Sequence, residues 1–503
     1  MPLNTTLVVQ TLTVGLDTSG HKYNVYSCSK SRICRIPQGR IQANTFNGKL
    51  SVWRYMLRLF RAVYCPRPLN KGRRMSAQNP VIVIPGITAT SLVDDYPLKV
   101  DEIWTMVFNK EYERVALHPD DMRYEAVEPA HVAVGQPFPI YDDLIRALRH
   151  ELSPRADQPT PVFAFPYDWR MDVRASAAKL GAFVDEVLAR TKLLRHYADA
   201  DDLQVDLVGH SMGGLVICEY LAQFGRRSKI GKVATIGTPF LGSIEAIVKI
   251  TTGMSLLTGP EPKEREREAA RVMPALYQLF PSYMDATKNP QGDDVDIFDC
   301  ANMQNSVIDS LMEFVRMYSV STKSADRRSQ AKKILQDMLG SAREHRQTVD
   351  NFKTSNAALT QSDWLAIVGV GEKTRIQLTV DRDRRGPWFI IDESQFVNEL
   401  GGNNNRSHRT GDGTVPLPGA LPPFLAASKL VCVTEADLGL LELRDRLMVN
   451  LGGFHGLLPR INLVQRLVTK HLQPAYRGRV WGRRLPGSRS WNPPLAGLAE
   501  KDY

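Results

Sequence analysis

Three side chains far apart in the sequence have the types needed to activate a nucleophile. Ser211 lies in residues 209–214 (GHSMGG), Asp412 lies between two glycines, and His455 lies in residues 452–456 (GGFHG). A serine hydroxyl is a weak nucleophile at neutral pH, so it requires a neighbouring base whose orientation a carboxylate fixes. The three residues therefore indicate nucleophilic catalysis, with Ser211 as nucleophile, His455 as base and Asp412 as the acid that orients the base.

Other acids and histidines compete for the two partner roles. His471 falls in an expected helix at 459–471, where a surface position is expected, and the side chain of His210 is expected to point away from Ser211. The other late aspartates lack flanking glycines that permit an unusual turn, or come too late in the chain: Asp363, Asp381, Asp383, Asp392, Asp437 and Asp445. Asp412 and His455 are therefore the preferred partners.

The elements around Ser211 could hold its hydroxyl at the edge of a sheet. The apolar run 203–208 predicts a strand, and residues 215–221 predict a helix that ends at Gly225. A turn tight enough to join them crowds the backbone, so only glycine fits on either side of the serine. Strand, sharp turn and helix together are the nucleophile elbow of an α/β-hydrolase.

A second strand is expected to bring oxyanion donors to the same edge. Residues 80–84 are a proline followed by four β-branched residues, which is typical of a buried strand in a parallel sheet, and Pro85-Gly86 then ends it. In an α/β-hydrolase, the loop after this strand and the residue after the nucleophile each donate a main-chain N–H to the oxyanion. That assigns Ile87 and Met212 as donors. A plain strand end is the alternative for Ile87.

The rest of the chain alternates between strands and helices. The alternation predicts an α/β protein with a mostly parallel, doubly wound sheet. Residues 93–137 are expected to be irregular. Helices are expected at 138–151, 172–195 and 459–471, and further strands at 162–165, 232–236, 364–370, 376–380 and 429–433.

Residues 245–360 differ from this pattern because they are charged and helical in character, without a strong β-run. We interpret them as a helical cap over the carboxyl edge of the sheet, which could exclude water and hold a hydrophobic substrate. Residues 251–259, apolar and bounded by glycines, are a candidate mobile lid, and a permanently packed loop is the alternative. The predicted organisation is a basic extension (1–74), a first core part (75–244), the cap (245–360), a second core part (361–474) and a loosely ordered tail (475–503).

The composition is that of a globular protein, with 43% hydrophobic and 23% charged residues. No apolar run reaches the roughly 18 residues of a transmembrane helix, and the N-terminus makes a poor secretory signal. The six cysteines are scattered, and no Cys or His spacing suggests zinc, so neither a metal nor a cofactor is expected. A reducing, cytoplasmic setting is the expectation, with peripheral contact to a membrane left open.

The net charge of +10 is concentrated near the N-terminus, because residues 1–74 hold 13 Lys and Arg against a single acid. Within them, residues 51–64 predict a helix that suits an anionic membrane surface. There are two alternatives to a membrane helix. This region could be a docked or disordered extension, or translation could begin at Met75. Nucleic-acid binding is not expected, since no nucleic-acid motif accompanies the charge. The arginines of the predicted helix share one face: Arg54, Arg58 and Arg61.

Several of these motifs together resemble the lecithin:cholesterol acyltransferase family of α/β-hydrolases, which includes lysosomal phospholipase A2 and phospholipid:diacylglycerol acyltransferases. Residues 165–170 (FPYDWR) are the most specific part of the resemblance, which spans about residues 80–460. The disulfide cysteines of the secreted members are missing after residue 80, and residues 1–74 have no matching counterpart. The less specific motifs are residues 83–86 (VIPG), 209–214 (GHSMGG), 237–243 (GTPFLGS) and 411–415 (GDGTV).

The resemblance implies acyl transfer from a phospholipid or similar lipid ester. It also implies Ser211 as the acyl-accepting nucleophile, Asp412 and His455 as its partners, and an oxyanion hole at Ile87 and Met212. A carboxylesterase or triacylglycerol lipase is one alternative, and a non-catalytic lipid-binding protein on a hydrolase fold is another. The acyl acceptor and the oligomeric state are left open.

Three further residues are candidates for a substrate pocket. Trp104 could line an acyl or head-group pocket, or it could be an ordinary core tryptophan. Asp168 and Arg170 could act in the pocket, but an ion pair that braces the loop beside the sheet edge is the preferred interpretation. Trp169, between them, is expected to pack in the core.

Overall fold

The structure is a computed structural model of the chain, and it divides into two units, Met1–Met75 and Ser76–Tyr503. In the second unit it describes residues 77–96, 98–105, 110–119, 122–125, 131–254, 263–318, 323–391, 411–439 and 453–503. In the first unit it describes three strands, which form an antiparallel sheet: β1 Thr11–Leu16, β2 Lys22–Cys28 and β3 Arg32–Cys34. The helix predicted at 51–64 lies outside the described residues.

Six parallel strands form the central sheet of the second unit, in the order β15-β12-β10-β9-β4-β8. Because β4 lies beside β9, with Ile84 opposite Gly209, the loops that follow these two strands meet at one edge. The strands are β4 Val81–Ile84, β8 Val162–Ala164, β9 Val205–His210, β10 Ile230–Ile236, β12 Trp364–Gly369 and β15 Val431–Val433.

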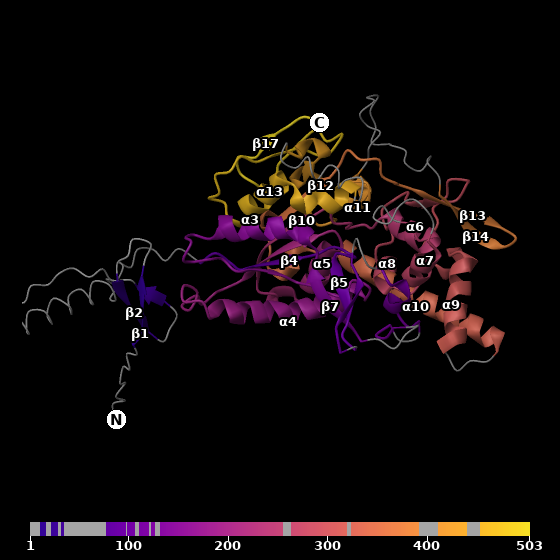
Figure 1. Ribbon diagram of the computed structural model, residues 1–503. Helices are drawn as coiled ribbons and strands as arrows, with labels where there is room; N and C mark the ends of the chain where they lie inside the picture. Colours follow the sequence, from indigo (N-terminus) through magenta and orange to yellow (C-terminus); the bar gives the residue numbers. More distant parts are fainter. Residues whose placement is uncertain are drawn as a thin grey trace, which may run out of the picture. The chain divides into compact units, whose positions relative to one another are not determined.

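Helices cover both faces of this sheet (Figure 1). Along β4, Ile82 and Ile84 belong to the core that α4 and α5 cover, whereas Val81 and Val83 belong to the core under α3 and α13. A strand buried on both faces must be apolar throughout, which explains its run of β-branched residues. The predicted doubly wound, mostly parallel sheet is confirmed. The helices are α3 Asp142–Leu152, α4 Val173–Lys192, α5 Met212–Phe224 and α13 Asn462–Leu472.

A small antiparallel sheet follows β4, where the sequence predicts irregular structure. Its order is β6-β5-β7, with strands β5 Thr90–Asp94, β6 Asp101–Trp104 and β7 Val132–Pro137. The prediction is wrong here because β6 and β7 are only partly buried and their pairing with β5 is interrupted by register shifts, so the segment lacks a regular alternation of apolar and polar residues.

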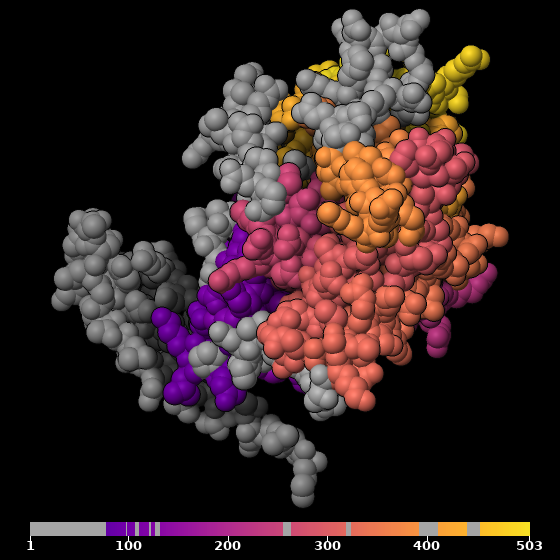
Figure 2. Space-filling view, turned by 90° about the vertical axis from the view of Figure 1, so that its right-hand side faces the viewer, coloured from indigo at the N-terminus to yellow at the C-terminus, as the bar shows by residue number. Residues whose placement is uncertain are grey.

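The insertion between β10 and β12 is mainly helical, and it occupies much of the face that Figure 2 shows. The first helix ends at Thr252, and Gly253 caps it with a φ of 77°. Residues 255–259 of the predicted lid lie outside the described residues, so the lid stays a prediction. The helices are α6 Ile244–Thr252, α7 Glu264–Arg271, α8 Pro274–Tyr277, α9 Asn305–Tyr318 and α10 Ser324–Asp350.

One strand expected in the core belongs instead to a second small sheet. β13 (Leu378–Asp383) pairs with β14 (Gly386–Ile390) and with β11 (Thr287–Lys288) of the insertion. Leu378 and Val380 are buried while the residues between and after them are not, which is typical of a strand with one solvated face. In contrast, the main-sheet strands β4, β9 and β12 are buried at every residue.

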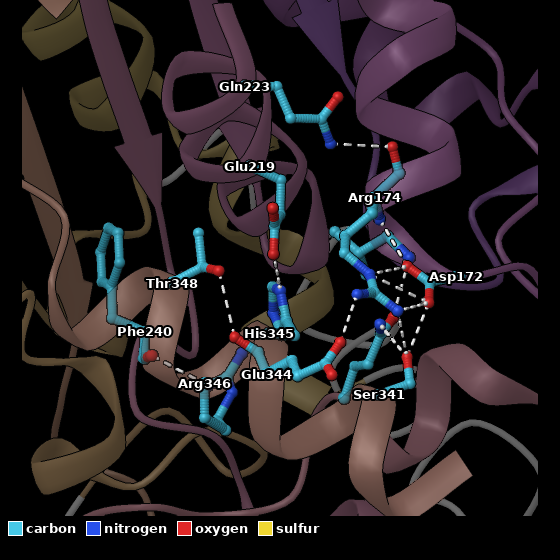
Figure 3. A network of polar contacts seen from close by, with 12 residues as sticks. Asp172, Arg174, Glu219, Gln223, Phe240, Ser341, Glu344, His345, Arg346 and Thr348 are labelled. Atoms are coloured by element: carbon cyan, nitrogen blue, oxygen red, sulfur yellow. Dashed lines mark hydrogen bonds and ion pairs between the residues drawn. The ribbon is translucent and has the colours of Figure 1, made fainter. Parts of the chain in front are cut away.

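The long helix α10 joins the insertion to the core through polar contacts (Figure 3). Arg174, in the first turn of α4, binds both Asp172 at 2.9 Å and Glu344 of α10 at 2.7 Å. The next residue of α10 is His345, and its Nδ1 lies 2.5 Å from a carboxylate oxygen of Glu219, which is on α5. The helix that follows Ser211 is therefore held directly by the insertion.

The C-terminal tail, predicted to be loosely ordered, packs against the outer strand of the sheet. Arg483 and Cys432 of β15 exchange two main-chain hydrogen bonds of 2.8 and 3.1 Å, and the Arg483 guanidinium pairs with buried Asp437. An edge strand leaves main-chain groups unpaired, and this segment satisfies some of them. The Pro- and Gly-rich composition of the tail conceals this role. Its short strands are β16 Trp481–Gly482 and β17 Ala499–Glu500.

In the ranges given above, none of the helices combines the length and apolarity that crossing a bilayer requires.

Candidate active site

Ser211 lies in a strained turn between β9 and α5. Its φ and ψ are 52° and −127°, and a positive φ is unfavourable for a residue with a Cβ. Such strain persists only where the surroundings impose it, and it is characteristic of a nucleophile elbow. A Cβ on Gly213 would lie 2.3 Å from the carbonyl oxygen of Ile84, so the close approach of α5 to β4 requires glycine there.

The structure brings the three predicted side chains together. Nε2 of His455 lies 2.9 Å from Oγ of Ser211, and Nδ1 of His455 lies 2.6 Å from Oδ2 of Asp412. All three residues are buried, at 7%, 8% and 1% exposure for Ser211, His455 and Asp412. The arrangement can pass the hydroxyl proton to the imidazole while the carboxylate holds the ring.

Local main-chain contacts orient the Asp412 carboxylate. Its Oδ1 accepts hydrogen bonds from the N–H groups of Val415 at 2.7 Å and Thr414 at 3.1 Å, which leaves Oδ2 directed at the His455 ring. The N–H of His455 also donates to the carbonyl of Asp412 at 3.1 Å, so the two loops are tied through main chain as well. A Cβ on Gly369, the last residue of β12, would lie 2.6 Å from Cβ of Asp412.

The described residues that could have replaced Asp412 or His455 make other contacts. Asp363 caps a short 3-10 turn before β12, while Asp381 and Asp383 belong to the separate strand β13. Asp392 lies outside the described residues. The surface position predicted for His471 is wrong, since this residue is only 3% exposed. Its Nε2 lies 3.2 Å from the carbonyl oxygen of Asp363, which gives the buried ring a polar partner.

The two predicted oxyanion donors belong to the elbow itself and to the loop after β4. Met212 opens α5, where the first N–H groups have no partner within the helix, and Ile87 follows Gly86. A Cβ on Gly86 would lie 3.5 Å from Oγ of Ser211, so this loop passes close to the hydroxyl. Neither N–H donates a hydrogen bond to another described residue. Their role as oxyanion donors stays a prediction.

Trp104 lies beneath the same loop. It is 5% exposed, its ring centroid lies 4.9 Å from that of Trp169, and its indole N–H donates to the carbonyl of Thr88 at 3.4 Å. These contacts support the loop that carries Ile87. Whether Trp104 also borders a substrate pocket stays a prediction.

Asp168 and Arg170 form a buried ion pair with two contacts, at 3.0 and 2.8 Å. Arg170 also donates to the carbonyl of Val115 and pairs with Glu125. Burial pushes the pKa of Asp168 upward, but the guanidinium outweighs it, so the pKa lies below its usual value. The pair joins three chain segments, which agrees with the bracing role preferred from the sequence, and a role in the pocket stays a prediction.

Sequence reasoning missed a polar chain behind the elbow. The side chain of His210 points away from Ser211, as expected, but it contacts the hydroxyl of Tyr141 at 2.8 Å and the carbonyl of His455 at 3.1 Å. From the sequence, Tyr141 was expected only within the helix predicted at 138–151. A buried tyrosine hydroxyl normally finds a partner, and that is the signal that could have found it.

Within the described part of the chain, no group of three or more His, Cys, Asp or Glu side chains is arranged to hold a metal ion.

The parallel sheet, the elbow and the converging side chains define an α/β-hydrolase. The sequence model of the lecithin:cholesterol acyltransferase family matches residues 130–417, more than half of the chain. The chain therefore belongs to the lecithin:cholesterol acyltransferase family. Direct comparison with curated protein sequences finds no match.

One solved structure shows the same fold at low identity. A chain of the Tle4–Tli4 complex is 16% identical with a TM-score of 0.51, over 80% of this chain and 100% of that one. Phospholipase PlaB from Legionella pneumophila is 11% identical over 41% of this chain and 36% of its own, and its TM-score of 0.22 is too low to support an inference.

Proposed function

We propose that this protein is a serine-dependent O-acyltransferase or phospholipase that acts on lipid esters through an acyl-enzyme. Membership of the lecithin:cholesterol acyltransferase family supports activity on lipid esters in general. The observation that carries the finer proposal is the contact of 2.9 Å between Nε2 of His455 and Oγ of Ser211, with Asp412 behind the ring. Two alternatives to this function stay open. One is carboxylesterase or triacylglycerol lipase activity, and the other is lipid binding without catalysis.

In the first half-reaction, Oγ of Ser211 bonds to the ester carbonyl carbon while its proton passes to Nε2 of His455. The carbonyl electrons move to oxygen, and the resulting oxyanion accepts hydrogen bonds from the N–H groups of Ile87 and Met212. The C–O bond to the lysolipid then breaks, and the leaving oxygen takes the proton from His455. The acyl group remains on Ser211.

In the second half-reaction, the acceptor is water or the hydroxyl of a lipid. It gives its proton to His455 as its oxygen bonds to the acyl carbon, and Ser211 leaves with that proton. Hydrolysis and transfer differ only in the acceptor, so the balance depends on how well the site excludes water.

We propose residues 245–360 as the cap that sets this balance, between core parts at 75–244 and 361–474. Two contacts support the proposal that the start of this cap is fixed close to Asp412. The hydroxyl of Ser243, which caps α6 at the start of the insertion, donates to the carbonyl of Thr414 at 2.6 Å, two residues after Asp412. The glycine before α6, Gly242, lies against the carbonyl of Phe280 in the insertion.

We propose peripheral membrane contact through the turn between β5 and β6. Three large apolar side chains are exposed there, Tyr96 at 77%, Leu98 at 111% and Val100 at 55%. Tyrosine, leucine and a neighbouring lysine suit the boundary between lipid and water. In sedimentation with phosphatidylcholine vesicles, Leu98→Asp should weaken binding at least threefold, while Leu193→Asp, at an exposed leucine after α4, should not. Equal binding of both variants would refute this contact.

The proposed function is tested by lipid product analysis of the wild type and Ser211→Ala, with phospholipid donor and a lipid alcohol acceptor. We expect lysolipid, together with fatty acid or the new ester, from the wild type and at least about 10³-fold less from the variant. Faster turnover of triolein or short p-nitrophenyl esters than of phospholipid would favour the esterase or lipase alternative. Equal activity of the two proteins would remove the proposal.

A further inference from the structure

A continuous chain of hydrogen bonds runs behind Ser211 and joins the two loops that flank it. The N–H of Gly86 donates to the hydroxyl of Tyr141 at 2.9 Å, this hydroxyl contacts Nδ1 of His210 at 2.8 Å, and Nε2 of His210 contacts the carbonyl of His455 at 3.1 Å. Tyr141 is fully buried and His210 is 4% exposed. The chain begins one residue before Ile87 and ends on the residue that bears the proposed base.

The donors and acceptors of this chain have one consistent assignment. The carbonyl of His455 can only accept, so Nε2 of His210 must carry a hydrogen. Burial and the neighbouring His455 lower the pKa of His210 to about 3, so its other nitrogen, Nδ1, is unprotonated. Nδ1 then accepts the hydroxyl hydrogen of Tyr141, while the oxygen of that hydroxyl accepts the Gly86 N–H.

The neutral state of His210 suits its position. Its ring centroid lies 5.1 Å from that of His455, which must become an imidazolium during each half-reaction. A second positive charge at this distance in a buried site would oppose that protonation. His210 thus holds the carbonyl of His455 without competing for its proton.

We propose that Tyr141 and His210 are positioning residues that fix the Gly86–Ile87 loop and His455 relative to Ser211. This inference rests on the proposed acyl-transfer function and adds two residues to its machinery. Gly86 passes so close that an added Cβ would lie 3.0 Å from Cβ of Ser211, so a small shift of this loop displaces the N–H of Ile87. Misplacement by about 1 Å can cost on the order of 10² in rate.

Tyr141→Phe tests the inference, because it removes the hydroxyl that joins Gly86 to His210 and keeps the ring. With a p-nitrophenyl ester we expect kcat to fall about 10- to 100-fold and KM to stay within about twofold. The rate of fluorophosphonate labelling should fall in parallel. The matched control is Tyr197→Phe, which loses a part-buried hydrogen bond of 2.7 Å from the tyrosine hydroxyl to the carbonyl of Gln78, before the opposite end of β4. The control should leave kcat unchanged.

A second pair of variants separates positioning from packing. His210→Gln keeps an amide N–H for the carbonyl of His455, whereas His210→Leu has similar size and no donor. We expect the Gln variant to retain about tenfold more kcat than the Leu variant at equal melting temperature.

Two results would overturn the inference: kcat of Tyr141→Phe within twofold of wild type, or a loss of kcat matched by equal loss in Tyr197→Phe. A wild-type protein that neither turns over esters nor reacts with the fluorophosphonate would instead defeat the proposed function itself, so the two failures are distinguishable.

Discussion

Asp412 shows how a single carboxylate can set the state of its neighbour. Its Oδ1 is occupied by two main-chain N–H groups, so only Oδ2 faces Nδ1 of His455. Nδ1 therefore carries the hydrogen, and Nε2 is left free to accept the proton of Ser211.

Asp412→Asn should reverse this assignment. The amide oxygen would stay on the N–H groups of Thr414 and Val415, so the NH2 group would face Nδ1 and move the imidazole hydrogen to Nε2. We expect kcat to fall about 10³- to 10⁴-fold with little change in melting temperature. Asp381→Asn, at another aspartate that the sequence offered, should have wild-type kcat, and comparable losses in both variants would contradict the assignment.

Two glycines give opposite predictions for stability. A Cβ at Gly213 would lie 2.3 Å from the carbonyl oxygen of Ile84, whereas a Cβ at Gly340 in α10 would meet nothing within 4 Å. Gly213→Ala should lower the free energy of unfolding by about 1–3 kcal/mol or more. Gly340→Ala should raise it by about 0.5–1 kcal/mol, because alanine favours the helix. Chemical denaturation measures both, and equal effects would show that the close approach at Gly213 does not hold.

At the scale of elements, the contact of α10 with α5 places ionisable groups in the interior. Glu219 and His345 are both buried, and burial raises the pKa of the Glu219 carboxyl to about 7 and keeps that of His345 well below its usual value. Figure 3 shows this pair beside the Arg174 contacts, which join a third helix, α4, to α10.

This pair predicts a pH dependence of stability. Between the ordinary carboxyl value of 4.5 and about 7, the folded protein binds a proton at Glu219 that the unfolded chain does not. Stability therefore falls as pH rises through this window, by about 3 kcal/mol. His345 has the opposite effect on stability. Below about pH 6.5 its imidazole binds a proton in the unfolded chain but not in the folded protein, so this residue lowers stability as pH falls.

Glu219→Gln should remove the fall in folding stability with rising pH. The opposite pH dependence that His345 causes should remain. The measurement is the free energy of unfolding between pH 5 and 8, with Glu344→Gln, at the 67% exposed neighbour of His345, as the control. An unchanged pH slope in Glu219→Gln would show that this carboxyl does not titrate in the window.

The elements predicted correctly from the sequence are those with a strong local signal. Strands β4, β9, β10 and β12 are apolar on both faces, and the elbow is marked by its glycines. The strands β5 to β7 and β13 were missed or misplaced, since β6, β7 and β13 are partly exposed and β5 to β7 pair with register shifts, which weakens the local pattern. For the site, Ser211, Asp412 and His455 were brought together as expected, whereas the contact of Tyr141 with His210 depends on how the short turn before α3 meets the end of β9.

At the scale of the whole molecule, the C-terminal tail completes the sheet at β15. The Arg483 guanidinium is 5% exposed and its partner Asp437 is fully buried, whereas the next residue, Arg484, forms an exposed pair with Glu500. A buried charge that loses its partner costs far more than an exposed one.

Replacement of these neighbouring arginines should therefore have unequal effects. Arg483→Met should lower the free energy of unfolding by about 2–4 kcal/mol, because Asp437 would keep only hydrogen bonds from neutral groups. Arg484→Met should change it by about 0–1 kcal/mol. Equal values from denaturation of the two variants would mean that the tail does not stabilise the sheet edge.

If Ser211 forms the covalent bond to the acyl group, peptide mass spectrometry after reaction with a fluorophosphonate lipid analogue detects this bond directly. We predict a single adduct on Ser211 that is absent from Ser211→Ala and formed at least about 10²-fold more slowly in His455→Ala. No adduct on the wild-type protein, or an adduct on another residue that persists in Ser211→Ala, would contradict it.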